Sequence, residues 1–147
     1  MPYSLPSPHQ AFEITMTDGA EIKVRRHGNS DGVRLIISHG NGFAINGYLP
    51  FWELLAGDFD LVLFDMRNHG MNEITGADGH HYEQMARDLE TIFLGVRQVL
   101  GAKTSVGIFH SMSARAAMKH ATEICWRWDA LALYDPPNVP MPGHDQY

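Results

Sequence analysis

The residues around Ser111 are of the types that nucleophilic catalysis needs. Ser111 stands between an apolar run, residues 106–109, and a run rich in small residues that favours a helix. A strand that turns sharply into a helix lifts a serine hydroxyl out of a sheet and points the next N–H at the same space. A serine becomes a nucleophile only when a base takes its proton, and such a turn presents it for that step. The pattern predicts Ser111 as a nucleophile, with an ordinary helix N-cap as the alternative.

The neighbours of Ser111 fit this interpretation with one exception. Small residues are expected two positions before and after such a serine, because the backbones of the strand and the helix crowd there. Ser113 and Ala114 meet this need on the helix side, whereas Phe109 occupies the position where a glycine is common. His110 and Met112, on either side of the serine, favour the nucleophile over the cap.

A second segment could stabilise negative charge beside this serine. Residues 38–43 read Ser-His-Gly-Asn-Gly-Phe and follow the apolar run 35–37. Glycines allow a tight turn and leave backbone N–H groups free to face a ligand. Two such donors can stabilise the charge that develops on a carbonyl oxygen in a transition state. The alternative is a plain glycine turn with a hydrogen-bonded His39.

The elements that must position these residues are predicted from apolar patterns. Alternation around Asp18-Gly19 predicts a β-hairpin with one wet face. Continuous apolar runs predict parallel strands covered on both faces, at residues 35–37, 61–64, 106–109 and 131–134. The sequence therefore predicts an α/β fold, with a mostly parallel sheet of about six strands and an antiparallel N-terminal hairpin.

Three helices are predicted between these strands. Pro50 suits the first turn of one helix. From Tyr82 to Leu100 an apolar stripe at helical spacing, which includes Val99, predicts a longer helix that stops at Gly101. The third helix is predicted from Ser111 to about residue 126. Cys125, near its end, is expected to be a buried structural thiol.

Composition excludes several classes of function. The chain has 147 residues, 44% of them hydrophobic, which suffices for one core, and a formal net charge of −6 argues against a surface for nucleic acid or anionic membranes. One cysteine cannot form an intramolecular disulfide. The N-terminus lacks the pattern of a signal peptide and no apolar run is long enough to cross a bilayer, so the cytoplasm is the default location. His80 and His81 suggest a metal pair, but no third ligand supports one, and no metal site is expected.

Together, the three segments at residues 38–43, 65–70 and 104–119 resemble motifs of the α/β-hydrolase superfamily, in the right order and after the right strands. Residues 65–70, Asp-Met-Arg-Asn-His-Gly, are similar to the Asp-x-Arg-Gly-His-Gly turn after the fourth strand of many members, with Asn68 in place of the first glycine. The resemblance covers the chain from the first hairpin to Asp135. It implies acyl transfer to water by a serine–histidine–acid triad without a cofactor, on a small ester-like substrate.

The resemblance also implies roles for individual residues. The N–H groups of Asn41 and Met112 would form an oxyanion hole, with Gly42 as the alternative to Asn41. Asp65 and Arg67 would brace loops beside the site. The residues expected to line or support the site are His39, Gly40, Gly42, Phe43 and His110.

The chain departs from the superfamily pattern after its sixth predicted strand. Members have eight strands, with the acid usually after the seventh and the histidine after the eighth, and neither fits into residues 136–147. Asp135 is a candidate acid because some members place the acid after the sixth strand. His144 lies nine residues further on, in a proline-rich stretch with no strand to fix it.

We therefore expect the N-terminal part of a serine hydrolase that lacks its base, as in a truncated gene product or one half of a split enzyme. The alternatives are a non-catalytic domain used for binding or assembly, and an enzyme whose histidine comes from another subunit. The expected organisation is a flexible tail at residues 1–10, a core at 11–135 and the start of a cap or linker at 136–147. An unpaired strand at residues 131–134 predicts self-association or pairing with a complementing C-terminal segment.

Overall fold

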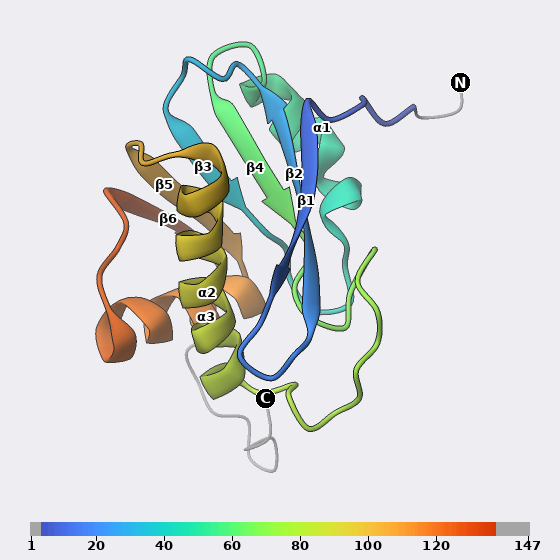
Figure 1. Ribbon diagram of the computed structural model, residues 1–147, viewed down its shortest axis with the longest axis vertical. Coiled ribbons are helices and arrows are strands. Elements are labelled where there is room, and N and C mark those ends of the chain that lie inside the picture. Colours follow the sequence, from blue (N-terminus) through green and yellow to red (C-terminus); the bar gives the residue numbers. More distant parts are fainter. Residues whose placement is uncertain (1–3, 138–147) are drawn as a thin grey trace.

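The computed structural model describes residues 4–137, which form a single six-stranded sheet with the strand order β1-β2-β4-β3-β5-β6 (Figure 1). The hairpin strands β1 and β2 are antiparallel, β2 joins β4 antiparallel, and the remaining pairs are parallel. The predicted fold class is confirmed. The strands are β1 (Gln10–Thr15), β2 (Glu21–Gly28), β3 (Arg34–Ile37), β4 (Asp60–Phe64), β5 (Ser105–His110) and β6 (Ala130–Tyr134).

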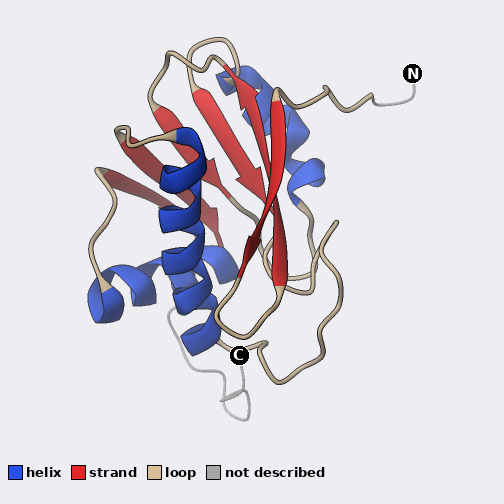
Figure 2. Cartoon of the chain, viewed as in Figure 1, coloured by secondary structure: helices blue, strands red, loops and turns tan. Residues whose placement is uncertain are grey.

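Helices cover both faces of the central strands (Figure 2). The helix predicted over Tyr82–Leu100 forms with these bounds as α2. The other helical segments are η1 (Ile45–Tyr48), α1 (Leu49–Trp52), η2 (Glu53–Leu55), α3 (Met112–Lys119) and η3 (His120–Ile124). In the described part of the chain, no helix is both long and apolar enough to cross a membrane.

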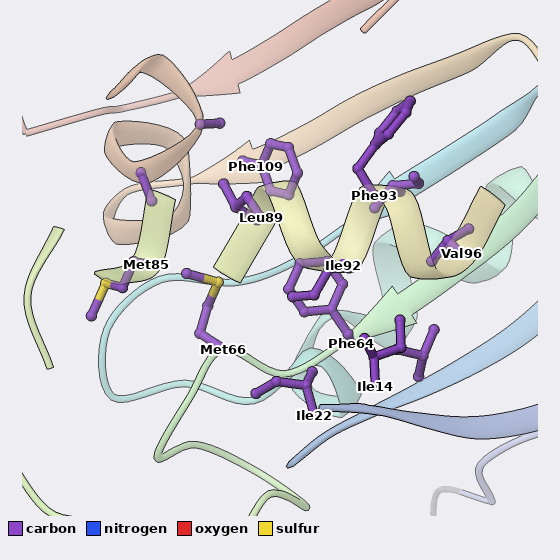
Figure 3. Close-up of a cluster of buried hydrophobic side chains, with 14 of the residues drawn as sticks. Ile14, Ile22, Phe64, Met66, Met85, Leu89, Ile92, Phe93, Val96 and Phe109 are labelled. Carbon is purple, nitrogen blue, oxygen red and sulfur yellow. The ribbon is translucent and has the colours of Figure 1, made fainter. Parts of the chain in front are cut away.

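Alternate side chains of β3 and β4 enter two separate hydrophobic clusters, which explains why these strands are apolar throughout. Ile36 and Phe64 pack in the cluster beneath α2, and Ile37 and Leu63 pack in the cluster with Trp52 of α1. Figure 3 shows the cluster beneath α2, where Met85, Leu89, Ile92, Phe93 and Val96 extend along the helix. The two clusters fix β3 and β4 at the centre of the molecule.

The predicted stripe of α2 is wrong at one position. Val99 lies on the apolar side by its helical angle, but it is in the last turn and is 47% exposed. The buried stripe therefore ends at Val96, and only Leu100 continues it as a partly buried side chain.

The third helix is shorter than predicted and changes its geometry. The α-helical part ends at Lys119, a π-helical turn continues to Ile124, and Cys125 has extended backbone. His120, fully buried, accounts for the change: it contacts the Glu90 carboxylate at 2.7 Å and accepts a hydrogen bond from the Trp128 indole. Cys125 is half-buried, so the prediction of a buried thiol is also wrong.

The ends of the predicted core are only partly described. His9 donates its N–H to the Arg26 carbonyl, so pairing with β2 begins before residue 11. The proposed boundaries at residues 10 and 135 stay predictions. His144 lies outside the described residues.

Candidate active site

Ser111 lies at the junction of β5 and α3 with φ 50° and ψ −113°. Such angles are strained for a residue with a side chain and cost about 1–3 kcal/mol. The surrounding structure holds them, because the Ser111 N–H donates to the Tyr134 carbonyl at 2.9 Å and the Arg115 N–H donates to the Ser111 carbonyl at 3.0 Å. Ser111 occupies the N-cap position of α3, but its side chain makes no capping hydrogen bond there.

The residues two positions from Ser111 are buried, as a crowded junction requires. Ser113 is fully buried and its hydroxyl lies 3.1 Å from both the N–H and the carbonyl of His110. Phe109 fits despite its size because Gly107 leaves room: a Cβ at Gly107 would lie 2.6 Å from the Phe109 ring. The departure at Phe109 is therefore accommodated within the strand itself.

The loop after β3 lies directly against Ser111. A Cβ at Gly40 would lie 3.2 Å from Ser111 Cβ and 3.2 Å from His110 Nδ1. Because β3 and β5 are parallel neighbours, their carboxyl ends meet at one edge of the sheet. The structure thus brings together the two segments that the sequence singled out, and a side chain at Gly40 would require its neighbours to shift by a few tenths of an ångström.

The amides of this loop differ in their partners. The Gly40 N–H donates to the Tyr48 hydroxyl at 3.1 Å, and the Gly42 N–H donates to His69 Nε2 at 3.1 Å. The Asn41 and Met112 N–H groups donate no hydrogen bond to any described residue. Asn41 rather than Gly42 is therefore the available donor, and it is exposed. That the Asn41 and Met112 amides converge on one point stays a prediction.

His39 and Asp65 support the loop from within. His39 is fully buried, and its Nε2 accepts the Met66 N–H at 3.1 Å. The Asp65 carboxylate accepts the N–H groups of Ile45 at 2.7 Å and Met71 at 3.2 Å. Burial alone would raise the pKa of Asp65, but the His39 ring, 3.3 Å away, and these amides outweigh it and hold the pKa below its usual value. The carboxylate is thus ionised and occupied by loop contacts.

Arg67 joins the turn after β4 to two other elements. Its guanidinium makes paired hydrogen bonds to Asp88 of α2, at 2.6 and 2.9 Å, and to Asp18 of the hairpin turn, at 2.9 and 3.1 Å. Asn68, which replaces a glycine of the family turn, has φ 61°, a conformation that asparagine tolerates better than most residues. Asp65 and Arg67 both make bracing contacts.

No base is placed on Ser111 by the described residues. Asp135 follows β6 with φ 47° and is exposed, and its carboxylate makes no hydrogen bond or ion pair within residues 4–137. No histidine or carboxylate in this range hydrogen-bonds to the Ser111 hydroxyl. The same range holds no group of three or more possible metal ligands, so His80 and His81 belong to none. His81 instead caps α2 by accepting the Gln84 N–H.

Tyr48 and His69 are hydrogen-bond partners of the loop after β3, and the sequence predicted this role for neither residue. Tyr48, half-buried in η1, places its hydroxyl 2.6 Å from His110 Nδ1. No local pattern predicts this contact, because it joins residues 62 positions apart. His69 lies in the turn that the sequence did single out, but nothing in the spacing predicts its bond to Gly42.

Phe43 completes the surroundings of His110 and is 59% exposed. Its ring lies 6.5 Å from that of His110 and 6.2 Å from that of Tyr48. Two hollows of the surface, of about 340 and 760 Å³, are lined by residues other than Ser111. That Ser111 faces a pocket also lined by residues 39–43 therefore stays a prediction.

The fold of the chain matches solved structures, although no family model and no curated protein matches its sequence. An α/β-hydrolase fold protein from Burkholderia ambifaria matches at TM-score 0.72 and 15% identity, over 94% of this chain and 47% of that one. An esterase from Exiguobacterium antarcticum matches at TM-score 0.71 and 22% identity, over 84% and 44%. A bottromycin epimerase, solved with bottromycin A2, matches at TM-score 0.75 and 19% identity, over 91% and 52%. The chain thus spans about half the length of these structures.

Proposed function

We propose that the chain, whose fold matches about half the length of solved α/β hydrolases, carries the nucleophile and the oxyanion hole of a serine hydrolase for ester or related acyl bonds. A fold alone does not determine chemistry, and the argument therefore rests on the site. The observation that carries the proposal is the strained backbone of Ser111, which packs against Gly40. Beside it, the Asn41 and Met112 N–H groups donate no hydrogen bond to a described residue.

In the proposed reaction, Ser111 Oγ attacks the carbonyl carbon of the substrate and forms a new C–O bond. The carbonyl π electrons move onto its oxygen, and the Asn41 and Met112 N–H groups stabilise that charge. The C=O bond re-forms as the C–O bond to the leaving alcohol breaks, and a general base passes the Ser111 proton to the alcohol oxygen. Water then attacks the acyl carbon, the acid is released, and the proton lost by the water returns through the base to Ser111 Oγ. One such donor contributes about 3 kcal/mol to the stabilisation of the transition state.

The base that takes the Ser111 proton is proposed to come from outside residues 4–137. This follows from the absence of any histidine hydrogen-bonded to Ser111 among them. The source is a later segment of the protein, a separate complementing chain or another subunit. Asp135, at the end of β6, is kept as the candidate acid, because Tyr134 before it pairs with His110 beside Ser111.

Labelling with a fluorophosphonate, followed by mass-spectrometric mapping, tests the proposal. A broken triad retains the part of catalysis that the oxyanion hole provides, so slow labelling of Ser111 is expected. Ser111→Ala should abolish it. Ser113→Ala is the matched control, since Ser113 is buried and bonds only to His110. Label on another serine with Ser111 untouched would exclude Ser111 as the nucleophile.

A second candidate function is a non-catalytic domain used for binding or assembly. The observation that favours it is the unpaired outer edge of β6, together with the lack of a base on Ser111 within residues 4–137. Hydrolysis of a p-nitrophenyl ester that disappears in Ser111→Ala would exclude this candidate.

A further inference from the structure

We propose that Tyr48 and His69 are positioning residues that select the Asn41 amide as the donor facing Ser111. This inference rests on the proposed function and deepens it, because it assigns the residues that set the oxyanion hole. Neither residue touches the reacting atoms in this scheme. Both act through the two amides on either side of Asn41.

The Tyr48 hydroxyl makes two hydrogen bonds. It accepts the Gly40 N–H at 3.1 Å, and its oxygen lies 2.6 Å from His110 Nδ1. A backbone amide can only donate, so the direction of the bond to Gly40 is fixed, whereas the direction of the bond to His110 depends on the tautomer of that ring. Tyr48 thus links the loop after β3 to the residue that precedes the nucleophile.

The His69 ring lies on the other side of Asn41, and its two partners fix its tautomer. Its Nδ1 lies 2.7 Å from the Arg67 carbonyl, which can only accept, so Nδ1 carries the proton. Nε2 is then free to accept the Gly42 N–H at 3.1 Å. Arg67 itself is fixed by its bonds to Asp18 and Asp88, so His69 anchors the loop to a rigid support.

These two anchors compensate for the flexibility of the loop sequence. Glycine on both sides of Asn41 gives the peptide planes freedom to rotate, and Gly42 has φ 76°. The Gly40 and Gly42 N–H groups are fixed by hydrogen bonds, whereas the Asn41 N–H between them donates to no described residue. A donor that is fixed before the substrate arrives costs no reorganisation during the reaction, which is what an oxyanion hole requires.

The first test replaces only the Tyr48 hydroxyl, with Tyr48→Phe. The matched control is Tyr134→Phe, since the Tyr134 ring also contacts His110, at 5.1 Å, but its hydroxyl makes no hydrogen bond to a described residue. In ¹H–¹⁵N NMR spectra of the whole chain, Tyr48→Phe should shift the Gly40 amide proton upfield. The His110 ring ¹⁵N signals should show that Nδ1 has lost its hydrogen-bond partner, and Tyr134→Phe should change neither signal.

The second test uses His69→Phe, which keeps a ring but removes the acceptor. It should shift the Gly42 amide and leave the Gly40 amide in place, the reverse of Tyr48→Phe. With the anchors lost, the rate of fluorophosphonate labelling at Ser111 should fall at least about tenfold in both variants. Labelling in Tyr134→Phe should match the unchanged protein.

The two sets of measurements separate this inference from the proposed function. If the variants give spectra of folded proteins but the Gly40 and Gly42 amide chemical shifts are unchanged, Tyr48 and His69 do not hold these amides and the inference is wrong. Shifted amides with undiminished labelling would show that the anchors do not set the donor, which also overturns the inference. A lack of labelling at Ser111 in the unchanged protein, with label on another serine, contradicts the proposed function, while the amide shifts still decide whether the anchors exist.

Discussion

At the scale of single residues, the backbone of Ser111 is the most informative feature. Its φ of 50° and ψ of −113° suit glycine far better than serine. The surrounding β5 and α3 impose these angles, and the serine gains no side-chain hydrogen bond from them. Backbone strain at a half-buried serine is typical of a position kept for chemistry and not for stability.

This strain leads to a prediction about stability. Ser111→Gly should raise the free energy of unfolding by about 1 kcal/mol relative to Ser111→Ala, because only glycine relaxes the positive φ. Both variants remove the hydroxyl, so the difference between them isolates the backbone. Urea unfolding followed by circular dichroism measures it. A Gly variant no more stable than the Ala variant would show that the backbone angles are not strained.

His27 of β2 gives a second prediction at this scale. It is 3% exposed beside Trp52, and burial, with the positive charge of Arg25 and His9, lowers its pKa to about 4. Since the unfolded chain keeps a pKa near 6.5, the unfolded state takes up the proton first as the pH falls. His27 therefore costs no stability above pH 6.5, and about 3 kcal/mol is lost as the pH falls to 4.

The variant His27→Leu should remove this part of the pH dependence. Unfolding free energies at pH 7 and pH 4.5, compared between the two proteins, provide the measurement. Ile74→Leu, an uncharged change at an exposed position, is the control and should leave the slope unchanged. An equal loss of stability in His27→Leu would mean that folding does not lower the pKa of His27.

At the scale of elements, the start of β4 depends on one buried carboxylate. Asp60 is fully buried and accepts hydrogen bonds from Arg26 of β2, Arg34 of β3 and Lys103 before β5. Burial raises the pKa of Asp60, but the bonds from Arg26 and Lys103 outweigh it, and the net pKa is lowered. Three cations thus converge on one anion where three strands meet.

Removal of that carboxylate should therefore be costly. Asp60→Asn leaves the buried Arg34 without its counter-charge and should lower the free energy of unfolding by about 3–5 kcal/mol. Asp58→Asn, an exposed change two residues earlier, should cost less than about 0.5 kcal/mol. Urea titration of both variants decides the point, and equal effects would contradict the importance of the cluster.

The elements also show what can be predicted from sequence. The strands and α2 could be predicted from local apolar patterns. For β3 and β4, the continuous apolar runs correspond to strands that are covered on both faces. The early end of α3 could not be predicted, since the buried contacts of His120 with Glu90 and Trp128 reshape the helix. For the candidate site, the types of residue predicted Ser111 and its loop. The partners Tyr48 and His69 depend on contacts between distant segments.

At the scale of the whole molecule, β6 ends the sheet with an unpaired edge. Within residues 4–137 it pairs only with β5, and Trp126 and Tyr134 near it are 60% and 71% exposed. An open edge beside exposed apolar side chains invites pairing with another strand. Self-association of the chain, or its rescue by a complementing segment, stays a prediction.

A charged substitution on the outer edge of β6 tests the prediction of self-association. Ala132→Lys, at an exposed position of β6, should lower the apparent mass of the protein in multi-angle light scattering. Leu94→Lys on the outer face of α2 adds the same charge away from the edge and should leave the mass unchanged. A monomer at all concentrations in the unchanged protein would contradict the prediction.

The two ion pairs of the Arg67 guanidinium have a consequence for how the molecule unfolds. Because one buried guanidinium binds both Asp18 of the hairpin turn and Asp88 of α2, the hairpin cannot separate from the helix without breaking an ion pair of that guanidinium. The N-terminal hairpin and α2 should therefore belong to one cooperative unfolding unit. Their amide protons should exchange with deuterated solvent at a common free energy of opening, although the two segments lie far apart in the sequence.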